Sequence, residues 1–303
     1  MFLPMAGEYP EAMTPADWHH GGRYFNWCGH EIFYREEGVG ARALLCIHGF
    51  PTASWDWSPI WPALCKRFTR VIAPDMLGFG FSAKPAQHNY SLMEQADLHE
   101  ALLARLGVRQ VHILAHDYGV SVVQELLARQ HEAKQAPSCL IESVALLNGG
   151  LFPETHRMTA MQKLLRSPFG GVATRLMTRG RFGQSFSMVF GPGTQPDADE
   201  LDQFWQLIRH NNGSRIMHRL IRYVGERRSH RERWVGALVN TRVPIRLING
   251  PEDPVSGAHM VARYRELVPH PDVVSLAGIG HYPQVEAPQT TLDALFAFHD
   301  RLA

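Results

Sequence analysis

Residues 112–120 read HILAHDYGV, and the apolar pattern VSVVQELLARQ continues from Val120. A short strand therefore runs into a helix through a tight turn that contains Asp117. Where a strand meets a helix this closely, small residues on both sides let one side chain stand above the edge of the sheet. Ala115 and Gly119 are the small residues here, and Asp117 is displayed. An aspartate at a helix start can also be a simple N-cap, and this stretch alone does not decide between the two.

Strand and helix patterns alternate on both sides of this turn. Strands are expected at a hairpin-like start and in a series of apolar runs, namely FNW at 25–27, then 31–36, 42–49, 70–75, 110–115, 138–148, 243–250 and 273–278. Between them lie helical patterns, the clearest of which opens at Ser91, has a capping box with Glu94, and stops at Gly107. Repeated strand–helix units predict a mostly parallel sheet covered by helices on both faces.

The alternation stops after Gly149 and Gly150, and residues 151–236 are helical in pattern throughout. We therefore expect a core domain of residues 1–150 and 237–303, with a helical cap of residues 151–236 inserted after strand 6. The cap carries 14 Lys and Arg but only 7 Asp and Glu, a formal charge of +7, whereas the whole chain is at +1. Solvated helix faces explain this charge, and a surface for weak contact with an anionic membrane, or for an acidic partner, is the alternative.

Composition excludes several classes of protein. The apolar share of 45% is ordinary for a globular protein, and the four cysteines show no CxxC spacing. The N-terminal MFLPMAGEYPEAM has no secretory pattern, no apolar run has the length of a membrane span, and no nucleic-acid motif is present. We expect a cytoplasmic protein with reduced thiols, no metal site and no cofactor, and the oligomeric state stays unknown.

Three further stretches follow predicted strands. The loop His48-Gly49-Phe50-Pro51 can direct the backbone N–H of Phe50, together with that of Tyr118, at an oxyanion. Asp253 lies in GPEDP, where Glu252 is the neighbouring alternative, and His281 lies in GIGHYPQVEAP. The chain order of nucleophile, acid and histidine is that of an α/β-hydrolase triad. The sequence thus predicts an α/β-hydrolase fold, with an eight-stranded sheet and an Asp117–His281–Asp253 triad.

The chain resembles the α/β-hydrolase superfamily, in the branch of epoxide hydrolases and haloalkane dehalogenases. Within it, the chain is most similar to the mesoderm-specific transcript protein-like hydrolases. Motifs across roughly 20–290 carry this resemblance, among them HGFPTASWDW, DMLGFGFSAKP, AHDYG, NGGLFPETHR, RERWVGAL and HYPQVEAP. It implies an aspartate nucleophile and leaves the physiological substrate open.

An aspartate is already an anion at neutral pH, since its ordinary pKa is about 3.9. It can displace a leaving group from saturated carbon and form an ester, which His281 hydrolyses as a general base while Asp253 orients the imidazole. The resemblance implies that a dehalogenase has tryptophan after the nucleophile, where this chain has Tyr118, and that an epoxide hydrolase has two cap tyrosines, where it has only Tyr223.

The expected activity is therefore hydrolysis of a small organic substrate, with an epoxide hydrolase as the leading hypothesis. A haloalkane dehalogenase or a hydrolase of another activated substrate, such as a lactone, is the alternative. A ligand-binding protein on a hydrolase scaffold is the non-enzyme alternative. Further residues are expected to contact the substrate or flank it, namely Tyr223, Trp55, Trp205, His48 and His116.

Overall fold

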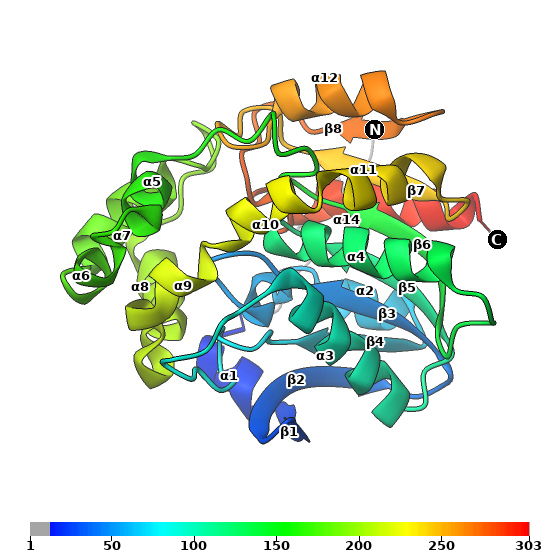
Figure 1. Cartoon of the computed structure of the whole chain (residues 1–303), viewed down its shortest axis with the longest axis horizontal. Coiled ribbons are helices and arrows are strands. Elements are labelled where there is room, and N and C mark those ends of the chain that lie inside the picture. Colours follow the sequence, from blue (N-terminus) through cyan, green and yellow to red (C-terminus); the bar gives the residue numbers. More distant parts are fainter. Residues whose placement is uncertain (1–12, 303) are drawn as a thin grey trace, which may run out of the picture.

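The computed structural model describes residues 13–302, and an eight-stranded sheet forms its centre (Figure 1). The strand order is β1-β2-β4-β3-β5-β6-β7-β8. Strand β2 runs antiparallel to β1 and β4, and the other neighbours are parallel. The strands are β1 (Gly22–Trp27), β2 (His30–Gly38), β3 (Arg42–Ile47), β4 (Arg70–Pro74), β5 (Gln110–Ala115), β6 (Leu140–Leu146), β7 (Ile245–Asn249) and β8 (Asp272–Ser275). The predicted fold class is confirmed.

Helices cover both faces of this sheet. In Figure 1, α3 and α4 lie in front of the strands, and α2 and α14 lie behind them. The helices outside the segment between β6 and β7 are α1 (Pro15–His20), α2 (Trp61–Arg67), α3 (Leu92–Arg105), α4 (Tyr118–Glu132), α12 (Ala258–Leu267), α13 (Pro283–Glu286) and α14 (Pro288–Asp300), with a 3₁₀ turn at Ser54–Trp57.

The capping box predicted for α3 is only half formed. The Ser91 hydroxyl accepts the backbone N–H of Glu94 at 3.1 Å, as expected of an N-cap. The Glu94 carboxylate does not return to the Ser91 backbone, because it binds the ring of His88 at 2.8 Å instead. A tertiary contact has therefore replaced the local one.

The chain between β6 and β7 is mostly helical, as predicted. It forms α5 (Ala160–Arg166), α6 (Gly170–Arg175), α7 (Arg179–Ser187), α8 (Ala198–Arg209), a 3₁₀ segment (His210–Ile216), α9 (Met217–Leu220), α10 (Tyr223–Ser229) and α11 (Arg231–Asn240). Helices α5–α9 project to one side of the sheet (Figure 1). Helix α11 instead packs against α4, where the Trp234 indole donates to Glu125 at 2.7 Å. Residue 236, where the expected cap ends, falls within α11.

The sheet and its covering helices share one apolar core, which includes the parallel strands β3, β5 and β6 almost entirely. All four cysteines are unbridged. In the part of the chain that the structure describes, no helix is both long enough and apolar enough to cross a membrane. The N-terminal stretch for which no secretory pattern was expected falls almost wholly outside the described residues.

Candidate active site

Asp117 occupies a strained turn between β5 and α4. Its φ of 43° and ψ of −104° are unusual for a residue with a side chain. The turn is tight because α4 passes close to β3: a Cβ at Gly119 would lie 2.5 Å from the carbonyl oxygen of Ile47. The Asp117 carboxylate does not cap its own helix. The N-cap alternative is therefore wrong, and the side chain is free to serve at the edge of the sheet.

The two carboxylate oxygens of Asp117 have different surroundings. Oδ2 accepts the backbone N–H of Phe50 at 3.0 Å. Oδ1 lies 3.8 Å from Nε2 of His281 and 3.9 Å from Nη2 of Arg227, beyond hydrogen-bond distance of both. Within residues 13–302 the backbone N–H of Tyr118 has no partner either, so it can serve as a second donor beside Phe50. The nucleophile thus has one held oxygen and one free oxygen.

Asp253 fixes the ring of His281. Its Oδ2 accepts Nδ1–H of His281 at 2.6 Å, and Asn148 donates to the same oxygen at 2.9 Å. Ser256 donates through both its hydroxyl and its backbone, and the backbone N–H of Val255 binds Oδ1. Asp253 is buried, whereas the neighbouring Glu252 is exposed. The acid that faces the imidazole is therefore Asp253.

Two neighbouring carboxylates favour the protonated form of the His281 imidazole. Burial by itself lowers the pKa of His281, but the carboxylates of Asp253 and Asp117 raise that pKa to about 9. Burial likewise opposes the charge of Asp253, yet His281 and the donors Ser256 and Asn148 hold the pKa of Asp253 well below its ordinary value. The triad is thus a chain of two carboxylates on either side of one cation.

Replacing Asp253 by Asn should lower kcat by about 10³–10⁴-fold, because the amide stabilises neither the imidazolium nor the correct ring tautomer. The matched control is Glu252→Gln, the same chemical change at the exposed neighbour, which should alter kcat less than about twofold. Steady-state kinetics on one substrate measures both. Equal losses in the two variants would contradict the assignment of Asp253.

Arg227, from α10, completes the site and was not predicted. It is 2% exposed, and its guanidinium carries a permanent charge. Nε donates to the Ser121 hydroxyl at 2.9 Å, Nη1 donates to Nδ1 of His156 at 3.3 Å, and Nη2 faces Asp117 with no hydrogen-bond partner among the described residues. Burial and Arg227 lower the pKa of His156 to about 3, so its neutral ring can accept. A Cβ on Gly150 would come within 1.8 Å of Nη1, so this glycine makes room for the arginine.

Tyr223, the predicted cap tyrosine, also lies in the site. Its ring lies under the guanidinium of Arg227, 4.5 Å from Cζ, and 4.6 Å from the ring of Tyr118. The hydroxyl is buried and has no hydrogen-bond partner within residues 13–302. Burial and the charge of Asp117 raise the pKa of Tyr223, and Arg227 partly offsets them. The Tyr118 hydroxyl lies in different surroundings: burial raises its pKa, and the carboxylate that adds most to this effect is that of Glu226.

His48 and His116 were expected beside the substrate, but both bind backbone instead. The ring of His48 accepts the N–H of Met76 at Nε2, so Nδ1–H donates to the carbonyl of Gly49 at 2.8 Å. His116 donates from Nε2 to the carbonyl of His281 at 2.8 Å, which helps to place that residue. Burial lowers the pKa of His48, and that of His116 to about 3, so neither ring is charged. Both rings thus hold the backbone around the site, and their contact with substrate stays a prediction.

A small apolar cavity of about 70 Å³ adjoins His281. Its walls include Phe50, Tyr282 and cap residues of α5 and α7. Trp55 and Trp205 do not line it, and their expected role as walls of the substrate pocket stays a prediction. Trp55 packs against Phe204 and donates to the carbonyl of Met13, and Trp205 stacks on Phe182. The volume is below the several hundred Å³ of a ligand pocket, and Asp117 itself is buried.

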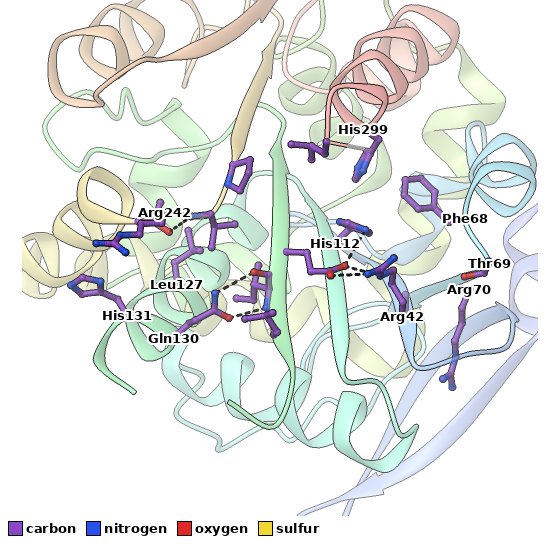
Figure 2. A pocket seen from close by; sticks show the side chains of 18 of the residues that line it. Arg42, Phe68, Thr69, Arg70, His112, Leu127, Gln130, His131, Arg242 and His299 are labelled. Atoms are coloured by element: carbon purple, nitrogen blue, oxygen red, sulfur yellow. Dashed lines mark hydrogen bonds and ion pairs between the residues drawn. The ribbon is translucent and has the colours of Figure 1, made fainter. Parts of the chain in front are cut away.

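A larger hollow of about 940 Å³ lies at the opposite edge of the sheet, where the parallel strands begin (Figure 2). Arg42 and His112, both labelled in Figure 2, lie at ion-pair distance from Glu142, which also lines the hollow. Asp117, His281 and Arg227 do not line it. In parallel sheets the functional residues gather at the carboxyl ends of the strands, so the hollow is not assigned to the chemistry. No cluster of three or more metal-ligating side chains occurs within residues 13–302.

Residues 42–288 match the model of the alpha/beta hydrolase fold. The chain belongs to the α/β-hydrolase family. The mesoderm-specific transcript homolog protein of Homo sapiens is 44% identical, over 98% of this chain and 92% of that protein. LipZ of Mycobacterium tuberculosis (strain ATCC 25618 / H37Rv) is 40% identical, over 92% of this chain and 95% of that protein.

Solved structures agree on the fold. The haloalkane dehalogenase DatA from Agrobacterium tumefaciens C58 has a TM-score of 0.78 at 21% identity, covering 93% of this chain and 97% of that one. The epoxide hydrolase CorEH has a TM-score of 0.74 at 19% identity, covering 93% and 99%. At these identities the likeness extends to the fold and not to the substrate.

Proposed function

We propose that this hydrolase acts through an ester of Asp117 and that its substrate is an epoxide. The observation that carries the proposal is the asymmetry of the Asp117 carboxylate. Oδ2 is held by the Phe50 N–H at 3.0 Å, and Oδ1 lies between His281 and Arg227 without a hydrogen bond to either. An anion with one anchored oxygen and one free oxygen is oriented for in-line attack on carbon.

In the first half of the reaction, Oδ1 attacks a saturated ring carbon of the epoxide. The new C–O bond forms as the ring C–O bond breaks, and the electron pair of the broken bond goes to the ring oxygen. That oxygen needs a proton because an alkoxide is a strong base. Tyr223 supplies it through the buried hydroxyl that lacks a partner in the described chain. Arg227, 4.5 Å from the ring centre, stabilises the negative charge that this donation leaves on the phenol.

In the second half, His281 takes a proton from water, and the hydroxide attacks the carboxyl carbon of the ester. Negative charge then develops on Oδ2, which already lies 3.0 Å from the Phe50 N–H, and one such donor is worth about 3 kcal/mol. Esterification also removes the charge of Asp117, one of the two carboxylates that raise the pKa of His281. The pKa of His281 therefore falls at the step that needs a neutral base, and the proton that it held at rest passes through solvent to the Tyr223 phenolate. The tetrahedral intermediate then collapses: the bond between the carboxyl carbon and Oδ1 breaks, and His281 returns the proton taken from water to the diol, which leaves with Oδ1.

Two tyrosines usually protonate the opening ring in the enzymes that this chain resembles, and here one tyrosine and one arginine lie at the site. Arg227 takes the place of a second donor, since its Nη2 points at the reacting carboxylate from the cap side with no other partner within residues 13–302. We assign the donor to Tyr223 rather than Tyr118, because Asp117 is among the charges that raise the pKa of Tyr223, whereas the carboxylate that contributes most to the raised pKa of Tyr118 is Glu226.

Tyr223→Phe should slow ring opening by about 10²-fold, since it removes the proton donor and leaves the nucleophile intact. The matched control is Tyr118→Phe, which removes an equally buried hydroxyl from the neighbouring ring and should change the rate less than about threefold. Rapid-quench measurement of the ester on Asp117 gives the rate. A loss confined to Tyr118→Phe would overturn the assignment of Tyr223 as the proton donor.

A second candidate rests on the free Nη2 of Arg227. A permanent cation at this position suits a leaving group that stays anionic, such as a halide or the carboxylate released when a strained lactone opens at its saturated carbon. Such a substrate needs no acid, so Tyr223→Phe would leave its turnover unchanged. The products separate the three classes: a diol from an epoxide, halide ion from a haloalkane, and a hydroxy acid from a lactone.

A further inference from the structure

Large apolar side chains are exposed on one part of the cap. Of the nine that the structure finds exposed within residues 13–302, five lie on α5–α7 or at their ends, namely Leu164, Phe169, Val172, Leu176 and Met188. Phe169 is 71% exposed and Leu176 is 60% exposed. We call residues 160–188 the cap tip. Exposed apolar residues scattered singly need no explanation, but a cluster of this kind marks an interaction surface.

The same stretch is basic without a compensating acid. Residues 155–196 contain six Lys and Arg and no Asp or Glu. Arg179 pairs with Asp202. The other five are exposed, and none of them forms an ion pair with a described residue: Arg157, Lys163, Arg166, Arg175 and Arg181. Because these cations surround an apolar cluster, the cap tip has a positive electrostatic potential around an apolar surface.

The cap tip also borders the active site. A shallow groove of about 270 Å³ runs along its apolar side chains, and its wall includes Met161 and Met177. The same two methionines line the cavity beside His281. The groove and the cavity beside His281 therefore share two flexible, unbranched side chains as a common wall.

We propose that the cap tip docks on anionic lipid bilayers. Phe169, Val172 and Leu176 enter the boundary between headgroups and acyl chains, while the surrounding cations lie at the lipid phosphates. The tip lies at one end of the long axis of the molecule, so it can meet a flat surface without hindrance from the core (Figure 1). An acidic protein or a nucleic acid would use the charge but leave the apolar cluster in water, so a bilayer fits both features.

Docking places the Met161–Met177 wall against the membrane. A lipophilic substrate can then pass from the bilayer to Asp117 without crossing water, when these side chains and α5–α7 move apart. This consequence rests on the proposed function, whereas the docking itself does not. Vesicle binding and substrate turnover are therefore measured separately. Loss of binding counts against the docking, and loss of epoxide turnover counts against the proposed function.

Flotation of the full chain with vesicles tests the docking. Wild type should float with phosphatidylcholine vesicles that contain about 30% phosphatidylserine, and much less with pure phosphatidylcholine. Lys163→Glu with Arg175→Glu should weaken binding at least about tenfold. The matched control is Arg105→Glu with Arg109→Glu, two exposed arginines of the core, which changes the net charge equally and should retain binding.

A second pair of variants tests the apolar part. Phe169→Ser with Leu176→Ser should reduce binding about tenfold, while Val39→Ser with Leu140→Ser, exposed apolar residues of the core, should not. No flotation of wild type, or equal losses in cap and core variants, overturns the proposal. So does retention on immobilised acidic polymer together with failure to bind vesicles. If docking holds, anionic vesicles should increase kcat/KM for a long-chain epoxide in wild type and not in Phe169→Ser/Leu176→Ser.

Discussion

Asp117→Asn should lower kcat by at least about 10⁴-fold, a loss of the size seen when a covalent nucleophile is removed. The amide has no anionic oxygen to attack carbon, yet its carbonyl can still accept the Phe50 N–H that now binds Oδ2 at 3.0 Å. The turn should therefore keep its shape. Kinetics on an epoxide series measures the loss, and circular dichroism with thermal melting verifies the fold.

A second variant, Asp117→Ala, removes both oxygens and should be equally inactive. Turnover by either variant above a few per cent of wild type would contradict the ester mechanism. The binding-protein alternative has a separate signature. Wild type would then bind ligand, turn over none of the three substrate classes, and respond to the ligand unchanged in His281→Ala.

In His281→Gln the ester should form and persist. Glutamine cannot take a proton from water, so hydrolysis of the ester should slow by about 10³–10⁴-fold while attack by Asp117 continues. The variant should consume one equivalent of substrate and stop. Mass spectrometry should find the peptide that contains Asp117 heavier by the mass of the substrate. A matched control is His131→Gln, a histidine at the opposite edge of the sheet.

Oxygen-18 water tests the same step in wild type. A single turnover should leave the label in the Asp117 carboxylate, because the hydroxide adds to the carboxyl carbon and the product leaves with the original Oδ1. Label in the product alone would show that water attacks the substrate directly. Accumulation of unreacted substrate in His281→Gln would place His281 before the ester, and the two-step scheme would fail.

Much of this architecture is encoded locally. The apolar runs before His48, Asp117 and Asn249 predict the central strands, because a strand buried on both faces has few polar positions. The small residues around Asp117 predict the turn, since a side chain at Gly119 would collide with β3. Positions after successive parallel strands meet at one edge, so Asp253 and His281 could be expected near the nucleophile.

Contacts distant in sequence could not be predicted in the same way. Arg227 is one of many cap arginines, and its buried hydrogen bonds to Ser121 and His156, both distant in sequence, distinguish it from the solvated ones. In the sequence Asn148 is an ordinary polar residue at the end of a strand, yet its side chain donates a hydrogen bond to Asp253. His48 lies beside the predicted oxyanion donor, but which backbone groups its two ring nitrogens would bind depends on neighbouring strands.

The position of Arg227 over Gly150 connects the charge beside Asp117 with the opening of the cap. The guanidinium that faces Asp117 belongs to α10, on the inserted segment whose helices α5 and α7 line the cavity beside His281, and the missing side chain at Gly150 leaves space for it. Lifting the segment to admit or discharge a large molecule withdraws the cation along with it. With the segment lifted, Asp117 no longer has the guanidinium of Arg227 beside it. Both charged neighbours of the nucleophile, His281 and Arg227, are then present together only when the segment is closed.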